Sequence, residues 1–180
     1  MKKILAIGAS NSKQSINKKL AIYVANKIEN ATINIADLNE LTLPLYSPDV
    51  EAKNGIPNNA LKFRAMIDDS DAIVLSLAEY NGMITTAFKN IWDWSSRVDM
   101  KIWKNKPMFL MAASPGGRGG VNALKVTKKL LPHFGGNVIT DFSLPLFFQN
   151  FSEEGIKDEN LNNDLINKIN LFQNSLNHIK

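Results

Sequence analysis

The sequence predicts an α/β fold in which a parallel sheet is covered on both faces by helices. Short apolar runs, typical of buried strands, alternate along the chain with segments whose apolar residues recur at helical spacing. Strands and helices that alternate in this way form parallel sheets flanked by helices. A length of 180 residues suits one such unit with a buried core, so we expect residues 1–180 to form a single domain.

The expected elements follow from this pattern in chain order. An apolar run that begins at Ile4 and stops at Gly8 predicts the first strand, and further strands are predicted at 31–38, 72–77, 107–113 and 137–142. Helices are predicted after residue 17 and at 58–69, 84–97, 120–134 and 160–179. A proline-rich loop is expected at 43–57. Three residues of the second helix are expected to face inward: Leu61, Ala65 and Met66.

The loop between the first strand and the first helix is rich in hydroxyl and amide side chains, namely Ser10, Asn11, Ser12, Ser15 and Asn17. The first N–H groups of a helix lack internal partners, and the helix dipole adds partial positive charge there, so such a loop favours an anion. Serine hydroxyls donate to phosphate oxygens without a fixed charge. The loop therefore predicts a phosphate site, although an ordinary loop with a serine helix cap explains the same residues.

Two other phosphate-binding motifs are excluded by this loop. A P-loop needs a Gly-Lys-Ser/Thr sequence after the strand, and a dinucleotide fingerprint needs three glycines, whereas the loop offers only Gly8. Serines in place of glycines favour a terminal phosphate that is held by side chains as well as backbone. A mononucleotide cofactor has such a phosphate.

Composition excludes several classes of protein and site. The chain has no cysteine, which rules out disulfides, thiolate metal sites and a cysteine nucleophile. An apolar content of 44% is too high for a disordered chain. No apolar run reaches the roughly 18 residues that a bilayer span needs, and the N-terminal run stops too early for a secretion signal. We expect a cytoplasmic protein that has no membrane partner.

Charge and histidine content argue against nucleic-acid and metal binding. The formal net charge is +4, but the lysines are scattered rather than gathered with stacking aromatic residues. The chain has two histidines, His133 at a predicted helix end and His178 near the C-terminus, and neither lies in a loop with carboxylates. We therefore expect no nucleic-acid partner, no metal and no Ser-His-Asp arrangement.

The loops after the third and fourth strands belong with the phosphate loop, because open parallel sheets bind ligands beyond the carboxyl ends of their strands. The first of these loops carries Tyr80, a planar surface, and Asn81, an amide that both donates and accepts. Glycines in both loops predict positive φ angles or close approach to a ligand: Gly82, Gly116, Gly117, Gly119 and Gly120. Together the loops predict a phosphate cradle and a slot for a flat heteroaromatic ring.

Three segments of the chain resemble those of a known family: GASNSKQSIN, AEYNGMITTAFKNIWDWSSR and ASPGGRGG. In this order and spacing they are similar to segments of the NAD(P)H-dependent FMN reductases, which include bacterial quinone, chromate and azo-dye reductases. The resemblance covers residues 3–141. It implies a flavodoxin-like three-layer sandwich with helices on both faces of a five-stranded parallel sheet of order 2-1-3-4-5. It also implies FMN as cofactor and NADPH or NADH as co-substrate.

The resemblance further implies which residues hold the cofactor. The phosphate contacts fall on Ser10, Ser12, Ser15, Ile16 and Asn17. Ser12 stands where the family usually has an arginine, so the charged contact of that arginine with the phosphate does not carry over. Ser12 itself or Lys13 would have to replace this contact. The flavin ring would be bordered on one side by Glu79, Tyr80, Asn81 and Gly82, and on the other by Ser114, Pro115, Gly116 and Gly117. For Arg118, contact with a dinucleotide phosphate and simple solvation both stay open.

The implied function is that of an NAD(P)H-dependent, FMN-containing oxidoreductase. Hydride passes from nicotinamide to flavin N5, and electrons then pass to a quinone, flavin, azo compound or other small oxidised acceptor. The flavin carries this chemistry, so no catalytic side chain is expected. The alternative is a flavodoxin-like electron carrier without its own nicotinamide-dependent turnover, although flavodoxins tend to be acidic and this chain is basic. A hydrolase would need a carboxylate cluster at the strand ends, where the sequence has none.

The helix predicted at 84–97 also suggests a subunit contact. It carries four large apolar residues, which is more than one buried stripe accommodates: Phe88, Ile91, Trp92 and Trp94. We expect part of this helix to pack against another subunit in a homodimer or homotetramer.

Overall fold

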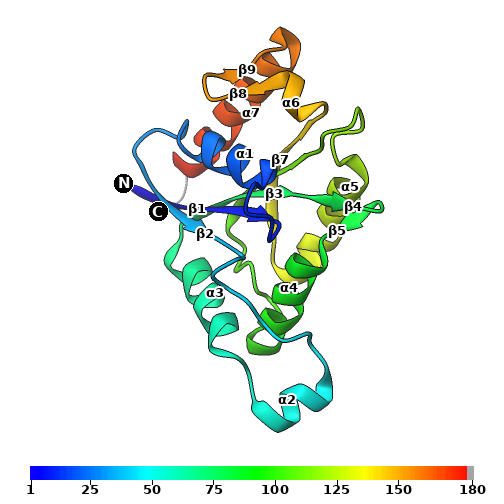
Figure 1. Cartoon of the computed structure of the whole chain (residues 1–180). Coiled ribbons are helices and arrows are strands. Elements are labelled where there is room, and N and C mark those ends of the chain that lie inside the picture. The colour runs from blue at the N-terminus through cyan, green and yellow to red at the C-terminus, as the bar shows by residue number, and fades with distance from the viewer. Residues whose placement is uncertain (178–180) are drawn as a thin grey trace.

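The computed structural model describes residues 1–177, and its central feature is a parallel sheet (Figure 1). Within those residues the sheet has five strands: β1 (Lys2–Ala9), β2 (Ala31–Ala36), β3 (Ala72–Leu77), β6 (Pro107–Ala113) and β7 (Asn137–Leu144). Their order is β2-β1-β3-β6-β7, and each neighbouring pair is parallel. Numbered among themselves, the strands have the order 2-1-3-4-5, which confirms the predicted topology.

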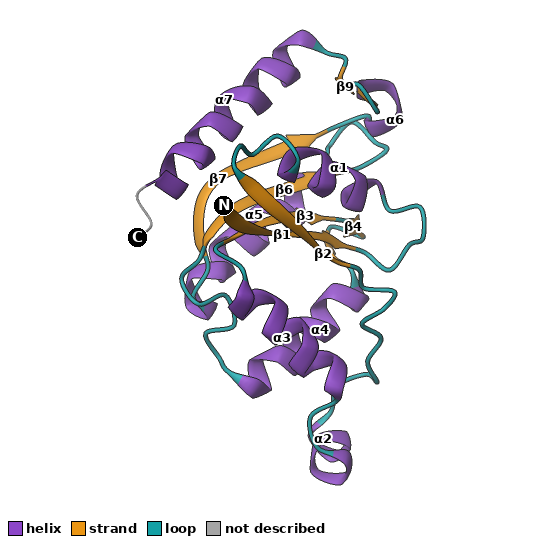
Figure 2. Ribbon diagram, turned by 90° about the vertical axis from the view of Figure 1, so that its left-hand side faces the viewer, coloured by secondary structure: helices purple, strands orange, loops and turns teal. Residues whose placement is uncertain are grey.

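Helices cover both faces of the sheet, as Figure 2 shows. One face carries α1 (Ile16–Ala25) and α7 (Glu159–Asn177), and the other carries α3 (Asn58–Asp69), α4 (Thr86–Val98) and α5 (Val121–Leu130). The side chains of β1 divide between the two cores because neighbouring residues of a strand point to opposite faces. Ile4 and Ala6 pack with α1 and α7, whereas Leu5 and Ile7 pack with α3 and α4.

Side-chain caps set where the helices that follow β1 and β3 begin. The N–H of Lys18 donates to Ser15 Oγ at 3.1 Å, which fixes the start of α1. The N–H of Phe88 donates to Thr85 Oγ1 at 3.1 Å and fixes the start of α4. The hydroxyl of Thr85 also donates to the Ala9 carbonyl oxygen at 2.9 Å, so α4 is anchored at the carboxyl end of β1.

Several short elements differ from the expected pattern. The loop expected at 43–57 contains α2 (Pro48–Asn54), which begins at a cap from Ser47 and projects from the body of the molecule (Figure 1). The remaining short elements are β4 (Glu79–Tyr80), β5 (Met83–Ile84), the 3-10 helix η1 (Leu131–Phe134), α6 (Phe147–Asn150), β8 (Phe151–Ser152) and β9 (Gly155–Ile156). Two-residue strands and the four-residue α6 are too short to show a hydrophobic period, so the sequence pattern did not predict them, whereas η1 lies within the helix predicted at 120–134.

The expected inner face of α3 is wrong for two of its three residues. Leu61 and Ala65 are exposed, whereas Met66 is half-buried and packs against the core. The buried stripe consists of Ala60, Phe63, Arg64 and Ile67. Arg64 was not predicted to face the core because arginine is a charged residue. Its guanidinium is nevertheless buried and pairs with the carboxylate of Asp68 at 3.0 Å. The final turn predicted for the last helix, with His178 and Ile179, lies outside the described residues.

The large apolar residues of α4 are buried within the single chain, so the argument that one chain could not bury them is wrong, whereas the oligomeric state stays a prediction. Phe88 and Trp94 are fully buried, Ile91 is 1% exposed and Trp92 is 6% exposed. The proline-rich loop folds over this helix, and Trp94 Nε1 donates to the Pro44 carbonyl oxygen at 2.7 Å. Among residues 1–177, none of the helices combines the length and apolar character that a bilayer span requires.

Candidate cofactor site

The three loops singled out in the sequence meet at the carboxyl ends of β1, β3 and β6. They enclose a cleft of 170 Å³. Nine of the expected site residues line it: Ser10, Ser12, Ser15, Ile16, Asn17, Glu79, Tyr80, Ser114 and Pro115. The cleft is completed by three residues that the sequence did not single out, Gln14, Ala78 and Ala113. Asn81, Gly82, Gly116 and Gly117 continue the same loops beyond this cleft.

The phosphate loop presents uncharged donors at the start of α1. Ser10 and Ser15 are 4% and 5% exposed. Ser10 Oγ accepts from the N–H of Ser12 at 3.1 Å, and Ser15 Oγ accepts from Lys18, so both hydroxyl protons stay available for a ligand. The N–H groups of Ile16 and Asn17 lie in the first turn of a ten-residue helix, where a helix offers no internal acceptor. This donor set fits a terminal phosphate.

The side chain of Asn17 is oriented away from that donor set. Its Nδ2 donates to the Ala113 carbonyl oxygen at 3.0 Å, and its Oδ1 accepts from the Ala113 N–H at 2.8 Å. The hydroxyl of Ser76 donates to the same Oδ1 at 2.7 Å. Asn17 is 1% exposed. It therefore ties α1 to the ends of β3 and β6, and only its backbone N–H is left for a phosphate.

Of the two lysines in the first turn of α1, Lys18 is already neutralised. Lys18 Nζ forms an ion pair with the carboxylate of Asp37, which follows β2. Burial opposes ionisation of Asp37, but hydrogen bonds from Lys18 and Asn39 outweigh it and lower the pKa of this carboxyl. Lys13 is exposed. The loop thus relies on backbone and hydroxyl donors where the family usually has an arginine.

The two loops that would border the ring are held together by Glu79. Its Oε2 accepts from the Ala123 N–H at 2.8 Å, in the first turn of α5. The carboxylate therefore caps the helix that follows the second loop, which supports a structural role for Glu79. Asn81 and Gly82, with φ angles of 53° and 79°, form the turn between β4 and β5, and this turn leaves Tyr80 56% exposed beside the cleft.

The glycines of the second loop fall into two groups. Gly119 and Gly120 have positive φ angles of 60° and 73°, as predicted. Gly116 and Gly117 have no positive φ, so of the two predicted reasons for a glycine only close approach to a ligand remains for them. A Cβ added to either would have no neighbour within 4 Å among the described residues. Their lack of a side chain therefore leaves open space along one wall of the site.

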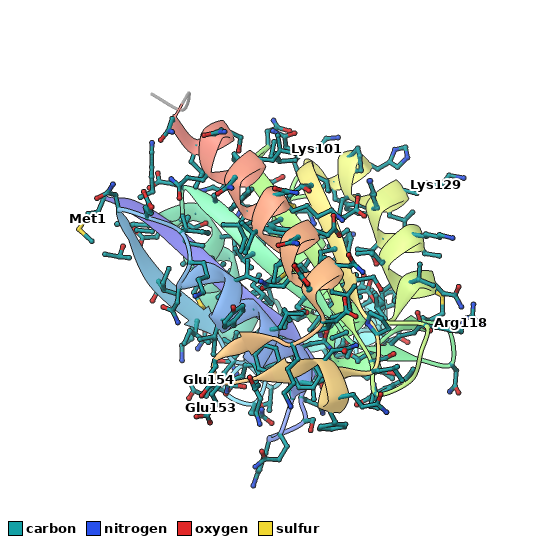
Figure 3. All side chains as sticks on the ribbon, turned by 90° about the horizontal axis from the view of Figure 1, so that it is seen from above. Met1, Lys101, Arg118, Lys129, Glu153 and Glu154 are labelled. Atoms are coloured by element: carbon teal, nitrogen blue, oxygen red, sulfur yellow. The ribbon has the colours of Figure 1, made fainter. Side chains whose placement is uncertain are left out.

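The segment after β7 supports this loop from behind. The N–H of Leu146 donates to the Gly116 carbonyl oxygen, and the N–H of Phe147 donates to the Ser114 carbonyl oxygen, both at 3.1 Å. This support was not predictable from the sequence, because Leu146 has a positive φ of 49° that neither its side chain nor its neighbours predict. Arg118 is exposed at the outer edge of the molecule (Figure 3) and donates to Asn122 Oδ1 at 3.0 Å.

Comparison with known proteins identifies the family. Residues 2–149 match the family described as NADPH-dependent FMN reductase. A quinone reductase of Pseudomonas putida is 30% identical over 130 residues, which is 71% of this chain and 68% of that protein. An NADPH azoreductase of a Bacillus species is 30% identical over 122 residues, 68% of this chain and 64% of that protein.

Solved structures show the same fold. FerB of Paracoccus denitrificans, described as a flavoenzyme NAD(P)H:(acceptor) oxidoreductase, has a TM-score of 0.78 and 25% identity, with 98% of each chain covered. A WrbA-like flavodoxin of Agrobacterium tumefaciens has a TM-score of 0.58 and 22% identity over 100% of both chains, which shows the fold alone. The chain therefore belongs to the NADPH-dependent FMN reductase family, flavodoxin-like oxidoreductases that use FMN together with NADPH or NADH.

Proposed function

We propose that this reductase binds FMN in the cleft at the carboxyl ends of β1, β3 and β6 and reduces small oxidised acceptors such as quinones, flavins and azo compounds. The observation that carries the site is the set of buried, uncharged donors at the start of α1, next to an exposed aromatic side chain and an open loop wall. The acceptor class is supported by the relatives, which include a quinone reductase and an azoreductase.

Each loop has a separate task in this proposal. Ser10, Ser12, Ser15 and the N–H groups of Ile16 and Asn17 hold the phosphate. The segments 79–82 and 114–117 border the ring, and Tyr80 offers it a planar face. When bound, FMN supplies the ring that takes hydride from the nicotinamide and passes electrons to the acceptor. The chain contributes by binding and orienting the reactants in one place, so catalysis rests on positioning.

The visible absorbance spectrum of the purified protein tests this function. We expect the spectrum of bound flavin, its bleaching when NADPH or NADH is added without oxygen, and its return when a quinone follows. A flavin spectrum that neither nucleotide bleaches would favour the electron-carrier alternative. The net charge of +4 supports a reductase, because flavodoxins that serve as carriers tend to be acidic.

The proposal includes the setting in which the protein works. We expect it to act in the cytoplasm as a homodimer or homotetramer, with no nucleic-acid or membrane partner. Both cores pack against one sheet, which supports a single domain over residues 1–180.

Replacing Ser10 or Ser15 with alanine should weaken FMN binding by about 1–3 kcal/mol, because each change removes a hydroxyl that donates to a charged phosphate. Riboflavin has no phosphate, so its affinity should stay unchanged in the Ser10→Ala protein. Fluorescence titration of both flavins measures the two affinities. If the wild type bound FMN and riboflavin with equal affinity, the loop at the start of α1 would not be the phosphate site.

Replacing Gly117 with valine should reduce turnover while leaving the fold intact. The position has open space and no positive φ, so the chain itself accepts a side chain. A ring bordered by this wall would meet the added bulk, and the rate of quinone reduction should fall by about tenfold or more, since overpacking costs about 1–3 kcal/mol. Circular dichroism and the reduction rate at saturating FMN are compared. Full activity in a folded Gly117→Val protein would show that this loop does not border the flavin ring.

A further inference from the structure

A buried threonine joins the two segments that would hold opposite ends of FMN. Thr85 is 1% exposed, and its hydroxyl donates to the Ala9 carbonyl oxygen at 2.9 Å. Thr85 Oγ1 also accepts from the N–H of Phe88 at 3.1 Å, as the cap of α4. One hydroxyl group therefore has a partner in β1 and a partner in α4, and both partners are backbone groups.

The place of Thr85 in the chain makes this contact relevant to the cofactor. The Ala9 carbonyl belongs to the peptide bond that leads to Ser10, the first hydroxyl of the phosphate loop. Thr85 itself directly follows the hairpin of β4 and β5, whose residues 79–82 would border the ring (Figure 1). The hydroxyl therefore ties the start of the phosphate loop to the end of the ring-binding hairpin.

Each of the two segments also has contacts of its own. The hairpin is held to the start of α5 by Glu79, which accepts from the Ala123 N–H at 2.8 Å. The phosphate loop is held by Asn17, which bonds to the N–H and carbonyl of Ala113. Loss of the Thr85 hydroxyl would therefore leave each segment in its own conformation and release mainly the spacing between them.

We propose that Thr85 is a positioning residue that sets the spacing between the phosphate loop and the ring-binding hairpin, and that this spacing determines the preference for FMN over riboflavin. This rests on the FMN site of the proposed function. A ligand that engages two sites at once gains affinity only where their spacing matches its own length. FMN is such a ligand. Riboflavin has no phosphate, so the spacing does not affect its affinity.

Removal of the hydroxyl tests this role. Thr85→Val keeps a branched side chain of similar size but cannot bond to the Ala9 carbonyl or the Phe88 N–H. Fluorescence titration of the cofactor-free full chain with each flavin gives two dissociation constants. We expect the ratio of the riboflavin constant to the FMN constant to fall by about tenfold or more, while the riboflavin constant itself stays unchanged. Thr85→Ser keeps the hydroxyl and should restore the wild-type ratio.

A second variant and a matched control separate this role from folding. Circular dichroism reports whether Thr85→Val folds, and Thr85→Ala takes its place if it does not, because the smaller side chain leaves room for a water molecule to bond to both backbone groups. The control is Ser47→Ala, which removes the cap of α2, where Ser47 Oγ accepts from the Val50 N–H at 3.2 Å. This helix projects from the body of the molecule (Figure 1), so the control should keep the wild-type ratio.

Either of two results would show that Thr85 does not set the spacing: a variant without the hydroxyl that binds both flavins more weakly by the same factor, or one that keeps the wild-type ratio. A wild type that binds both flavins equally would refute the phosphate site and the role of Thr85 together. Bleaching of the flavin spectrum by NADPH or NADH is recorded on the wild type. It reports the reductase function independently of the ratio, so the two can fail separately.

Discussion

Replacing Gly8 with alanine should weaken FMN binding and destabilise the protein. A Cβ at this position would lie 2.4 Å from Lys18 Cα and 2.6 Å from Lys18 N. These are backbone atoms of α1 and cannot rotate away, so the start of the helix would have to move off the end of β1. Misplacing reacting groups by about 1 Å can slow catalysis by about 100-fold, and overpacking a core costs about 1–3 kcal/mol of stability. We therefore expect slower turnover, weaker FMN binding and a lower unfolding temperature than in the wild type.

Gly116→Ala is the matched control for this change. The same substitution there meets no atom of the described chain within 4 Å, so the unfolding temperature should equal that of the wild type. Thermal unfolding of the cofactor-free proteins and FMN titration are measured for both variants. A Gly8→Ala protein that binds FMN as tightly as the wild type would show that α1 tolerates the shift and that the phosphate loop does not depend on its close approach to the strand.

The buried part of the fold was predictable because strand burial leaves a plain pattern. The strands at 72–77 and 107–113 and the helix at 58–69 have the boundaries that the sequence predicts. Continuous apolar runs of this length form strands buried on both faces, and the glycine and polar residues that follow mark their ends. The second strand ends at Ala36 instead of 38, where Asp37 turns to pair with Lys18.

The directions of individual side chains were less predictable. Apolar content alone suggested that α4 had more large residues than one chain buries, yet the proline-rich loop covers Trp94. That cover depends on contacts between segments about fifty residues apart, which no local pattern contains. The same limit applies to Arg64, whose buried guanidinium is stabilised by Asp68 and by Asp99 from beyond the next helix.

In the candidate site, too, the segments were predictable and the directions of their side chains were not. The sequence located the three loops, because hydroxyl-rich and glycine-rich segments after strands are visible directly. It did not show what each side chain faces. An amide such as that of Asn17 binds a phosphate or a backbone peptide equally well, and only the position of Ala113 decides between them. Glu79 likewise has its hydrogen-bond partner at the start of α5, more than forty residues along the chain, and no local pattern shows this contact.

Replacing Asn17 with alanine should lower the stability of the protein even without FMN. The change leaves the N–H and carbonyl of Ala113 and the hydroxyl of Ser76 without their partner in a buried place, and each unpaired group costs about 1–3 kcal/mol. We expect a total loss of about 3–5 kcal/mol in the free energy of unfolding, together with weaker FMN binding, because the end of β6 and the start of α1 are no longer tied.

Urea unfolding of the cofactor-free protein separates this role from direct phosphate contact. If the side chain of Asn17 only contacted the phosphate, Asn17→Ala would weaken FMN binding and leave the cofactor-free protein as stable as the wild type. Ser76→Ala is the control, because it removes one of the three hydrogen bonds and keeps the amide bonded to Ala113. Its loss should be about 1 kcal/mol. A cofactor-free Asn17→Ala protein as stable as the wild type would return Asn17 to the phosphate contacts that the family resemblance implies.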